Sequence, residues 1–174
     1  MIGKKINKSV NDLFSGLLEQ KDFEEKYYDT FTSKDIIDAL EIAYAQKDGN
    51  LLSNTFFIAF SFNLIDDSLL HLLRDLLLEN WHREHEDIVS LFQRRFNTDI
   101  DVIPILTNAI NDIPIYIIEN GDKYSYLRKI IYAIGYHPFP HNRNALLKLL
   151  EINDETLKEL IKHQLKKKYC NNLR

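Results

Sequence analysis

The residues best suited to chemistry in this chain lie in the segment WHREHED, which contains the only tryptophan. His82, His85 and Glu86 are spaced i, i+3 and i+4, so one face of a helix could present all three side chains to a metal ion. The order HREHE differs from the H-E-x-x-H zinc motif, and neither a distant cysteine nor a run of acids completes a ligand set. We therefore predict no metal site. The segment is better explained as a helix start capped by Glu84, Glu86 and Asp87, or as an exposed polar patch that recognises a partner.

The other candidate catalytic groups have no suitable neighbours in the sequence. His137 and His141 flank the letters PFP, and loop histidines without a carboxylate partner are expected to be exposed to solvent. Cys170, the only cysteine, stands in a polar tail with no adjacent base to activate it. The sequence has no nucleophile elbow, P-loop, dinucleotide-binding glycine pattern or paired cysteine motif. These observations predict a protein that is not an enzyme and that uses no cofactor.

Charge is unevenly distributed along the chain, whose formal net charge is −4. Residues 1–122 carry 11 Lys/Arg and 22 Asp/Glu, whereas residues 123–174 carry 11 and 4, so the two parts have net charges of −11 and +7. The acidic part would attract a basic partner and repel phosphate backbones. The basic end, KHQLKKKYCNNLR, is explained by a solvated terminal helix, because lysines suit the negative end of a helix dipole. We therefore predict a basic protein partner and no direct contact with nucleic acid.

Length and composition indicate a single helical domain that covers residues 1–174. The 5 glycines and 4 prolines are too few for an all-β chain with many tight turns, which favours long helices. The N-terminal residues have no continuous apolar segment of the secretory kind, and the apolar runs are too short to span a bilayer. A single cysteine cannot form an internal disulfide, so we predict a cytoplasmic protein without membrane contact.

The elements that must position these residues are predicted from apolar periodicity at i, i+3, i+4 and i+7. The letters KDFEEKYYDTF form either a connector or a short helix, and FFIAFSF could be a strand if a partner strand existed. Ser33 is the expected N-cap of one helix, Gly135 the expected left-handed stop of another, and Asp112–Lys123 the longest break in regular structure. The predicted helices are Ser9–Gln20, Lys34–Gln46, Leu51–Leu64, Leu69–Asn80, 88–96, 102–110, Tyr124–Ile134, Asn142–Glu151 and Asp154–Lys167.

The order of these elements is helix, short turn, helix, repeated at roughly 30–40 residues per pair, as in α-solenoids. The stretches VIPILTNAIND, LRKIIYAIG, ALLKLLE and ETLKELIKHQL resemble HEAT-like repeats, in which a helix with a Pro-apolar start precedes one that ends in Ala-x-Gly. Ala133 and Gly135 match the small residues at which such helices pack closely. The predicted fold class is therefore all-α, with stacked antiparallel helix hairpins in a HEAT-like α-solenoid.

The block WHREHEDIVSLFQ, together with the AIG helix, further resembles small HEAT-like immunity proteins encoded beside bacterial contact-dependent-inhibition and other polymorphic toxins. The likeness covers about residues 70–168. It implies an immunity protein that binds and blocks a cognate toxin domain, with a basic nuclease as the expected kind. The alternatives are a non-catalytic HEAT-like scaffold or adaptor in another bacterial complex, and a metal-dependent enzyme centred on His82, His85 and Glu86.

The toxin would be recognised by exposed acids and aromatics near the helix start and in the insertion IPIYIIENGDKY, because a long loop in a compact helical array is often functional. Trp81, at a turn between two helices, is expected to be partly buried, although tryptophan is also a common interface anchor. The predicted toxin-binding residues are Trp81, Glu84, Glu86, Asp87, Tyr116, Glu119, Asp122, Tyr124 and Tyr126.

Overall fold

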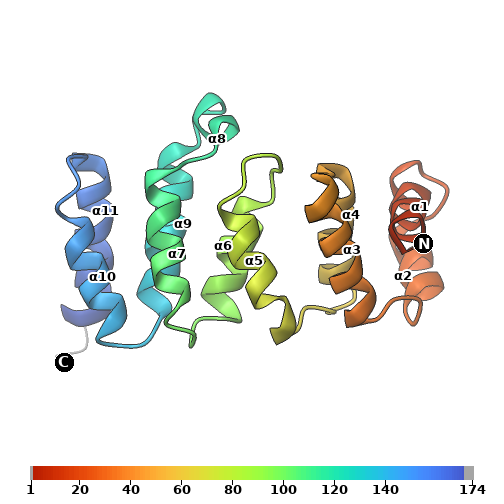
Figure 1. Ribbon diagram of the computed structural model, residues 1–174, viewed down its shortest axis with the longest axis horizontal. Helices are drawn as coiled ribbons and strands as arrows, with labels where there is room; N and C mark the ends of the chain where they lie inside the picture. Colours follow the sequence, from red (N-terminus) through yellow and green to blue (C-terminus); the bar gives the residue numbers. More distant parts are fainter. Residues whose placement is uncertain (1, 171–174) are drawn as a thin grey trace. The chain divides into compact units, whose positions relative to one another are not determined.

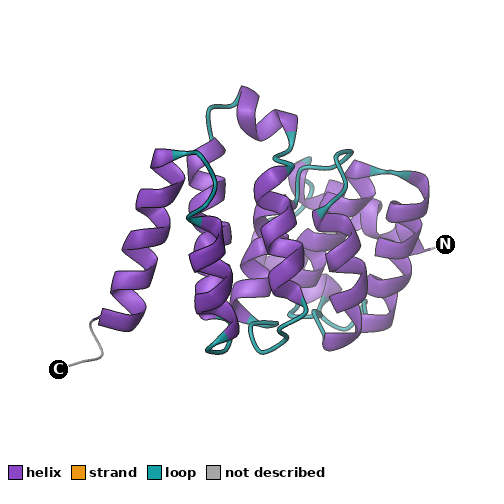
Figure 2. Cartoon of the chain, turned by 60° about the vertical axis from the view of Figure 1, so that its left-hand side comes forward, coloured by secondary structure: helices purple, strands orange, loops and turns teal. Residues whose placement is uncertain are grey.

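The computed structural model describes residues 2–170, apart from the side chain of Cys170, and all of its regular structure is helical (Figures 1 and 2). No strand occurs among these residues, so the predicted all-α class is confirmed. The chain divides into two compact units. Unit 1 comprises Met1–Leu73 and Trp81–Glu84, and unit 2 comprises Arg74–Asn80 and His85–Arg174. The end of the predicted basic tail, residues 171–174, lies outside the described residues.

Unit 1 is built around α4, which packs against both α1 and α3. Its buried side chains are aromatic and aliphatic, with Phe56, Leu52 and Ile58 almost completely shielded from solvent. The letters FFIAFS lie in α4 and the following Phe62 is its C-cap, so the strand alternative is excluded. The helices of unit 1 are α1 (Ile2–Phe14), α2 (Gln20–Tyr27), α3 (Ser33–Gln46) and α4 (Gly49–Ser61), followed by the short 3-10 turn Asp67–Leu69; α5 (Leu70–Leu77) continues into unit 2.

The first helix begins and ends earlier than the sequence predicts. We expected Ser9–Gln20, but α1 ends at Phe14 because Gly16 takes a positive φ of 76°. The amide of Gly16 donates to the carbonyl of Leu13 at 3.0 Å, which is one of the hydrogen bonds that close a left-handed helix end. The segment KDFEEKYYDTF, for which both a connector and a short helix are expected, provides most of α2 (Gln20–Tyr27).

The cap of α3 is one residue earlier than predicted. Thr32, not Ser33, accepts the amide of Asp35 at 3.2 Å, and the Asp35 carboxylate accepts the amide of Thr32 at 2.9 Å. This reciprocal pair is a capping box, which satisfies two otherwise unpaired amides. Lys47, with φ of 52°, ends α3, and Asp48 then caps α4 by accepting the amide of Leu51 at 3.0 Å.

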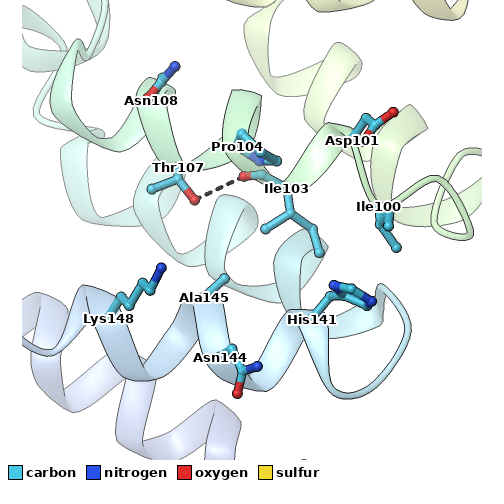
Figure 3. A pocket seen from close by; sticks show the side chains of 10 residues that line it. All are labelled: Ile100, Asp101, Ile103, Pro104, Thr107, Asn108, His141, Asn144, Ala145 and Lys148. Atoms are coloured by element: carbon cyan, nitrogen blue, oxygen red, sulfur yellow. Dashed lines mark hydrogen bonds between the residues drawn. The ribbon is translucent and has the colours of Figure 1, made fainter.

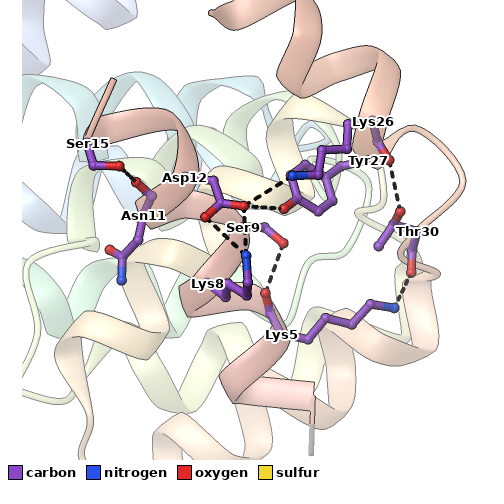
Figure 4. Close-up of polar contacts among 9 residues, drawn as sticks. All are labelled: Lys5, Lys8, Ser9, Asn11, Asp12, Ser15, Lys26, Tyr27 and Thr30. Atoms are coloured by element: carbon purple, nitrogen blue, oxygen red, sulfur yellow. Dashed lines mark hydrogen bonds and ion pairs between the residues drawn. The ribbon is translucent and has the colours of Figure 1, made fainter. Parts of the chain in front are cut away.

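Helices α1 and α2 are joined through the buried carboxylate of Asp12 (Figure 4). It accepts hydrogen bonds from the Tyr27 hydroxyl at 2.8 Å, the Lys8 ammonium at 3.0 Å and the Lys26 ammonium at 3.3 Å. The Tyr27 hydrogen bond, followed by that from Lys8, lowers the pKa of Asp12 to about 2. Because the folded state favours the carboxylate, this link stabilises the fold above about pH 4 and is lost as the pH falls through about 2.

Unit 2 is organised around α9, which packs against α6, α7, α8, α10 and α11. The buried face of α9 includes Leu127, Ile130, Ile131 and Ile134, each at most 1% exposed. The helices of unit 2 after α5 are α6 (His85–Arg94), α7 (Val102–Asn111), α8 (Ile115–Glu119), α9 (Lys123–Tyr136), α10 (His141–Leu149) and α11 (Glu155–Leu165), with a final π-helical turn at Lys166–Cys170.

Two predictions about glycine and the long break are wrong in this unit. Gly135 does not stop α9 in a left-handed conformation, since the helix continues to Tyr136 and positive-φ glycines in the described residues are confined to Gly16 and Gly121. The predicted break Asp112–Lys123 contains the short helix α8, and it is Gly121, with φ of 78°, that follows this helix.

His137 is buried, contrary to the prediction that both histidines beside PFP are exposed. Its side chain is 1% exposed because it falls on the same side of α9 as Ile130 and Ile134, whereas His141 is exposed as expected. Within the described residues neither ring nitrogen of His137 has a hydrogen-bond partner of normal geometry, although the backbone of Asp99 lies close enough to act on the ring. Burial lowers the pKa of His137 to about 4, and the nearby Asp99 offsets only part of this effect.

Candidate functional site

Helix α8 extends beyond the ends of α7 and α9, the helices that precede and follow it (Figures 1 and 2). It has only five residues, between Pro114 and Gly121. A helix of this length is not stable alone in water, since nucleation costs more than one turn of hydrogen bonds returns. Contacts with the rest of unit 2 must therefore hold it in place.

Two side chains and one backbone bond hold α8. Ile117 is 2% exposed, and the amide of Asp122 donates to its carbonyl at 2.9 Å. The Tyr116 hydroxyl lies 3.2 Å from Nδ1 of His85, and Nε2 of His85 lies 2.7 Å from the carbonyl oxygen of Glu79. Because a carbonyl oxygen only accepts, Nε2 carries the hydrogen, and in the neutral ring Nδ1 accepts from Tyr116. His85 thus links α8 to the body of the unit.

The outward face of α8 and the start of α9 expose large apolar side chains. Ile115 is 63% exposed, Ile118 is 49% exposed and Tyr124 is 39% exposed. The two isoleucines are three residues apart, so they lie on one side of the helix. Acids surround them: the exposed carboxylates of Asp112, Glu119 and Asp122 make no hydrogen bond or ion pair within residues 2–170. We call these six residues the α8 surface.

A hollow of about 520 Å³ opens beside Ile118. At its rim Lys123 pairs with Asp154 at 3.2 Å, and the Tyr124 hydroxyl donates to the same carboxylate at 3.3 Å. The backbone amide of Leu157, and then Lys123, lower the pKa of Asp154. The charge of Asp154 is therefore neutralised by Lys123, and the carboxylate of Asp112 is the negative charge that remains among the side chains lining the hollow. The walls are mostly apolar, formed by Ile110, Ile113, Ile118, Leu127, Ile152 and Leu157.

The predicted toxin-binding residues fall into both units. Trp81 and Glu84 belong to unit 1, where the half-buried Trp81 ring packs edge-on against Tyr44 with ring centroids 6.4 Å apart. Glu84 accepts a hydrogen bond from Ser53 Oγ.

In unit 2 Glu86 pairs with the ammonium of Lys129, and Asp87 is exposed. Of the predicted residues, Glu119, Asp122 and Tyr124 lie together on the α8 surface, whereas Tyr116 faces inward to His85.

Tyr126 does not fit the predicted surface, because its side chain is 0% exposed. The i, i+2 spacing from Tyr124 places it on the opposite side of α9, against the core. Its hydroxyl is buried and has no hydrogen-bond partner within residues 2–170. Burial, with smaller contributions from Tyr116 and Glu86, raises the pKa of Tyr126 above its usual range.

Replacement of Tyr126 by phenylalanine is expected to raise the free energy of unfolding by about 1 kcal/mol, because it removes a desolvated hydroxyl that has no partner. Urea unfolding followed by circular dichroism measures the effect. The control Tyr28→Phe removes a hydroxyl from a side chain that is 71% exposed and is expected to change stability little. A loss of stability in Tyr126→Phe would mean that the hydroxyl has a partner, such as a buried water.

The sequence-based set missed Ile115, Ile118 and Asp112. The sequence feature that could have identified the isoleucines is their spacing of three residues directly after Pro114, which is typical of one side of a helix. The stretch was too short for a helix to be predicted there. The histidines considered for metal binding make protein contacts instead: His82 Nδ1 accepts the amide of Glu84 at 3.1 Å, and His85 holds α8. Among the described residues, no three His, Cys, Asp or Glu side chains are placed to hold a metal ion.

A second hollow, of about 580 Å³, lies between α7 and α10 (Figure 3). Its polar side chains do not converge. Asn108 and Asn144 point away from one another, and the Thr107 hydroxyl donates to the carbonyl of Ile103 at 2.9 Å. His141 and Lys148 lie at opposite ends of the hollow. This arrangement offers no set of groups directed at a common ligand.

Comparison of the chain with protein-family models, curated proteins and solved structures yields no match. No helix in residues 2–170 has the length and apolar character that crossing a membrane requires. The chemistry of the α8 surface is therefore the basis on which a function can be assigned.

Proposed function

We propose that this protein is a toxin-neutralising immunity protein, a non-catalytic module that binds a cognate bacterial toxin domain and blocks it. The partner is a basic domain, of which a nuclease is the expected kind, and the role requires a cytoplasmic protein. The observation that carries the proposal is the α8 surface, where isoleucines that are 63% and 49% exposed stand among three acids without partners in the described residues.

The α8 surface has the composition of a protein-binding site. Exposed isoleucine and tyrosine side chains supply apolar area that a partner can cover, and tyrosine is enriched among residues that dominate binding energy. The acids around them would speed association with a basic partner and reject an acidic one. The support that His85, Ile117 and Asp122 give to α8 reduces the ordering cost of binding.

The hollow beside Ile118 fits a lysine or arginine side chain of the partner. Its apolar walls can cover the methylene stem of such a side chain, while the carboxylate of Asp112 at the rim can receive the charged head. Lys123 already neutralises Asp154, so Asp112 is the acid that a partner cation would use.

The finer fold assignment belongs to the same proposal. We infer that consecutive helices form HEAT-like stacked hairpins, and the packing of α3 on α4 in unit 1 and of α10 on α11 in unit 2 supports this. The contact of Gly135 in α9 with Gln164 in α11 also agrees with the close helix approach that the Ala-x-Gly resemblance implies.

The proposal is tested with the toxin domain encoded by the adjacent gene. Co-expression should yield a stable complex and should protect cells from the toxin. Absence of both complex and protection would overturn the proposed function, and a complex with a housekeeping protein would favour the scaffold alternative.

The contribution of the hollow is tested by Asp112→Lys. This variant is expected to weaken the complex by about 10-fold, because a like charge then faces the partner cation. The matched control is Asp75→Lys, which reverses an exposed acid of α5 in the same unit. Equal effects of both substitutions would show that net charge alone, and not the hollow, attracts the partner.

A further inference from the structure

A third hollow, of about 320 Å³, lies beside α9 and the final turn of the described chain. Its volume is at the lower end of the range for small-molecule sites. Every described side chain that lines it carries a hydrogen-bond donor, and none of these side chains is an acid. The lining residues are Gln93 from α6, Tyr132 and Tyr136 from α9, Gln164 from α11, and Lys167 and Lys168 from the π-helical turn. We call this hollow the donor pocket.

Gly135 makes room for one of these donors. A Cβ atom at this position would lie 2.1 Å from Nε2 of Gln164 and 3.0 Å from its Cδ, so no other residue fits without moving that side chain. Gln164 is only 3% exposed, yet its amide makes no hydrogen bond with another described residue. The amide atoms still reach solvent, since neither is among the fully shielded side-chain atoms that lack a partner. A ligand in the donor pocket can therefore replace water there and form a hydrogen bond with the amide.

The carbonyl of Gly135 also positions Lys168. It accepts the ammonium of Lys168 and, at 3.0 Å, the side-chain amide of Asn142. Lys168 is half-buried, and burial lowers its pKa from the usual value. The predicted solvated lysine tail is therefore only partly solvated. A half-buried ammonium gains electrostatic stabilisation when an anion binds beside it, and the described side chains that line this pocket include no competing acid.

The tyrosines form aromatic walls beside the lysines. The ammonium of Lys167 lies 5.4 Å from the ring centre of Tyr132, and that of Lys168 lies 5.0 Å from the ring centre of Tyr136. The surrounding sequence adds long-range attraction for anions, since residues 123–174 have a net charge of +7. The local chemistry thus differs from that of the acidic α8 surface.

We propose that the donor pocket binds the phosphate group of a small molecule. The lysine ammoniums supply charge-assisted donors, the Gln164 amide and the tyrosine hydroxyls supply neutral ones, and the aromatic walls cover an attached organic group. The ligand is either inorganic phosphate or a nucleoside monophosphate, and both present the same anionic phosphate oxygens to the donors. The inference does not depend on toxin binding.

Calorimetric titration of the full chain with inorganic phosphate, and separately with adenosine monophosphate, tests the proposal at constant ionic strength. Saturable binding is expected with at least one probe. Tighter binding of the nucleotide would show that the organic group contacts the tyrosines, whereas equal affinities would show that phosphate alone is recognised. The absence of saturable binding with both probes would overturn the proposal.

Variants separate the pocket from general charge attraction. Lys167→Gln and Gln164→Leu are each expected to weaken phosphate binding by about 10-fold, because each removes a donor to a charged group. The matched control is Lys162→Gln on α11, an exposed lysine that pairs with Glu159 at 2.6 Å. Unfolding curves of all three variants exclude loss of folding as the cause. Equal weakening by Lys162→Gln would contradict a defined site.

Discussion

Replacement of Ile115 and Ile118 together by serine is expected to weaken binding of the cognate toxin domain by about 100-fold, with little change in the stability of the free protein. Both side chains are largely exposed in the free protein, so the fold gains little from them, whereas a partner that covers them gains their apolar area. Two such contacts contribute about 3 kcal/mol, which corresponds to the expected loss of affinity.

Titration of the purified toxin domain by calorimetry measures this effect, and urea unfolding checks the stability. Leu147→Ser is the control, since Leu147 is an apolar side chain of α10 that is 38% exposed and not part of the α8 surface. If the wild-type protein binds the toxin and the double variant binds it with the same affinity, the toxin-binding site does not include the α8 surface. The proposed immunity function would survive that result.

The free energy of unfolding is expected to fall by about 3 kcal/mol between pH 7 and pH 4 through His137 alone. The folded state holds this ring neutral, with a pKa of about 4 against an ordinary value of 6.5. Below pH 6.5 the unfolded chain therefore binds a proton that the folded chain does not. Stability decreases as the pH falls, until the folded protein also becomes protonated near pH 4.

His137→Leu isolates this contribution, because leucine fills the buried position without titrating. The difference in unfolding free energy between wild type and variant, measured by urea unfolding from pH 7 to pH 4, removes the parallel effect of the carboxylates. The exposed His141→Leu should leave the pH dependence of the wild type unchanged. Parallel pH curves for wild type and His137→Leu would contradict the lowered pKa.

The helical class and most helix positions could be predicted because they follow from apolar periodicity and a scarcity of glycine and proline. Helix ends were less predictable, since several neighbouring residues are suitable as the residue that caps or ends a helix. Thr32 and Ser33 are both good caps, and only the position of Asp35 three residues after Thr32 completes the capping box. Gly16 and Gly135 have the same side chain, but one ends a helix through its φ and the other admits the side chain of Gln164.

The candidate site was predicted only in part. The length of the insertion predicts a functional segment, and Glu119, Asp122 and Tyr124 lie on the α8 surface. A five-residue helix, however, is stabilised by contacts distant in sequence, such as that between Tyr116 and His85, which local propensity does not encode. The burial of Tyr126 and His137 likewise depends on helices that pack against α9.

Within the five residues of helix α8, the side chains available to a partner differ from the side chains that hold the helix in place. Ile115, Ile118 and Glu119 face outward, while Tyr116 and Ile117 attach the helix to unit 2. Substitution of an outward residue alters what the surface presents to a partner at small cost in stability, whereas substitution of an inward residue releases the helix. A protein built in this way can change its binding specificity through a few mutations at the outward positions and keep the same scaffold.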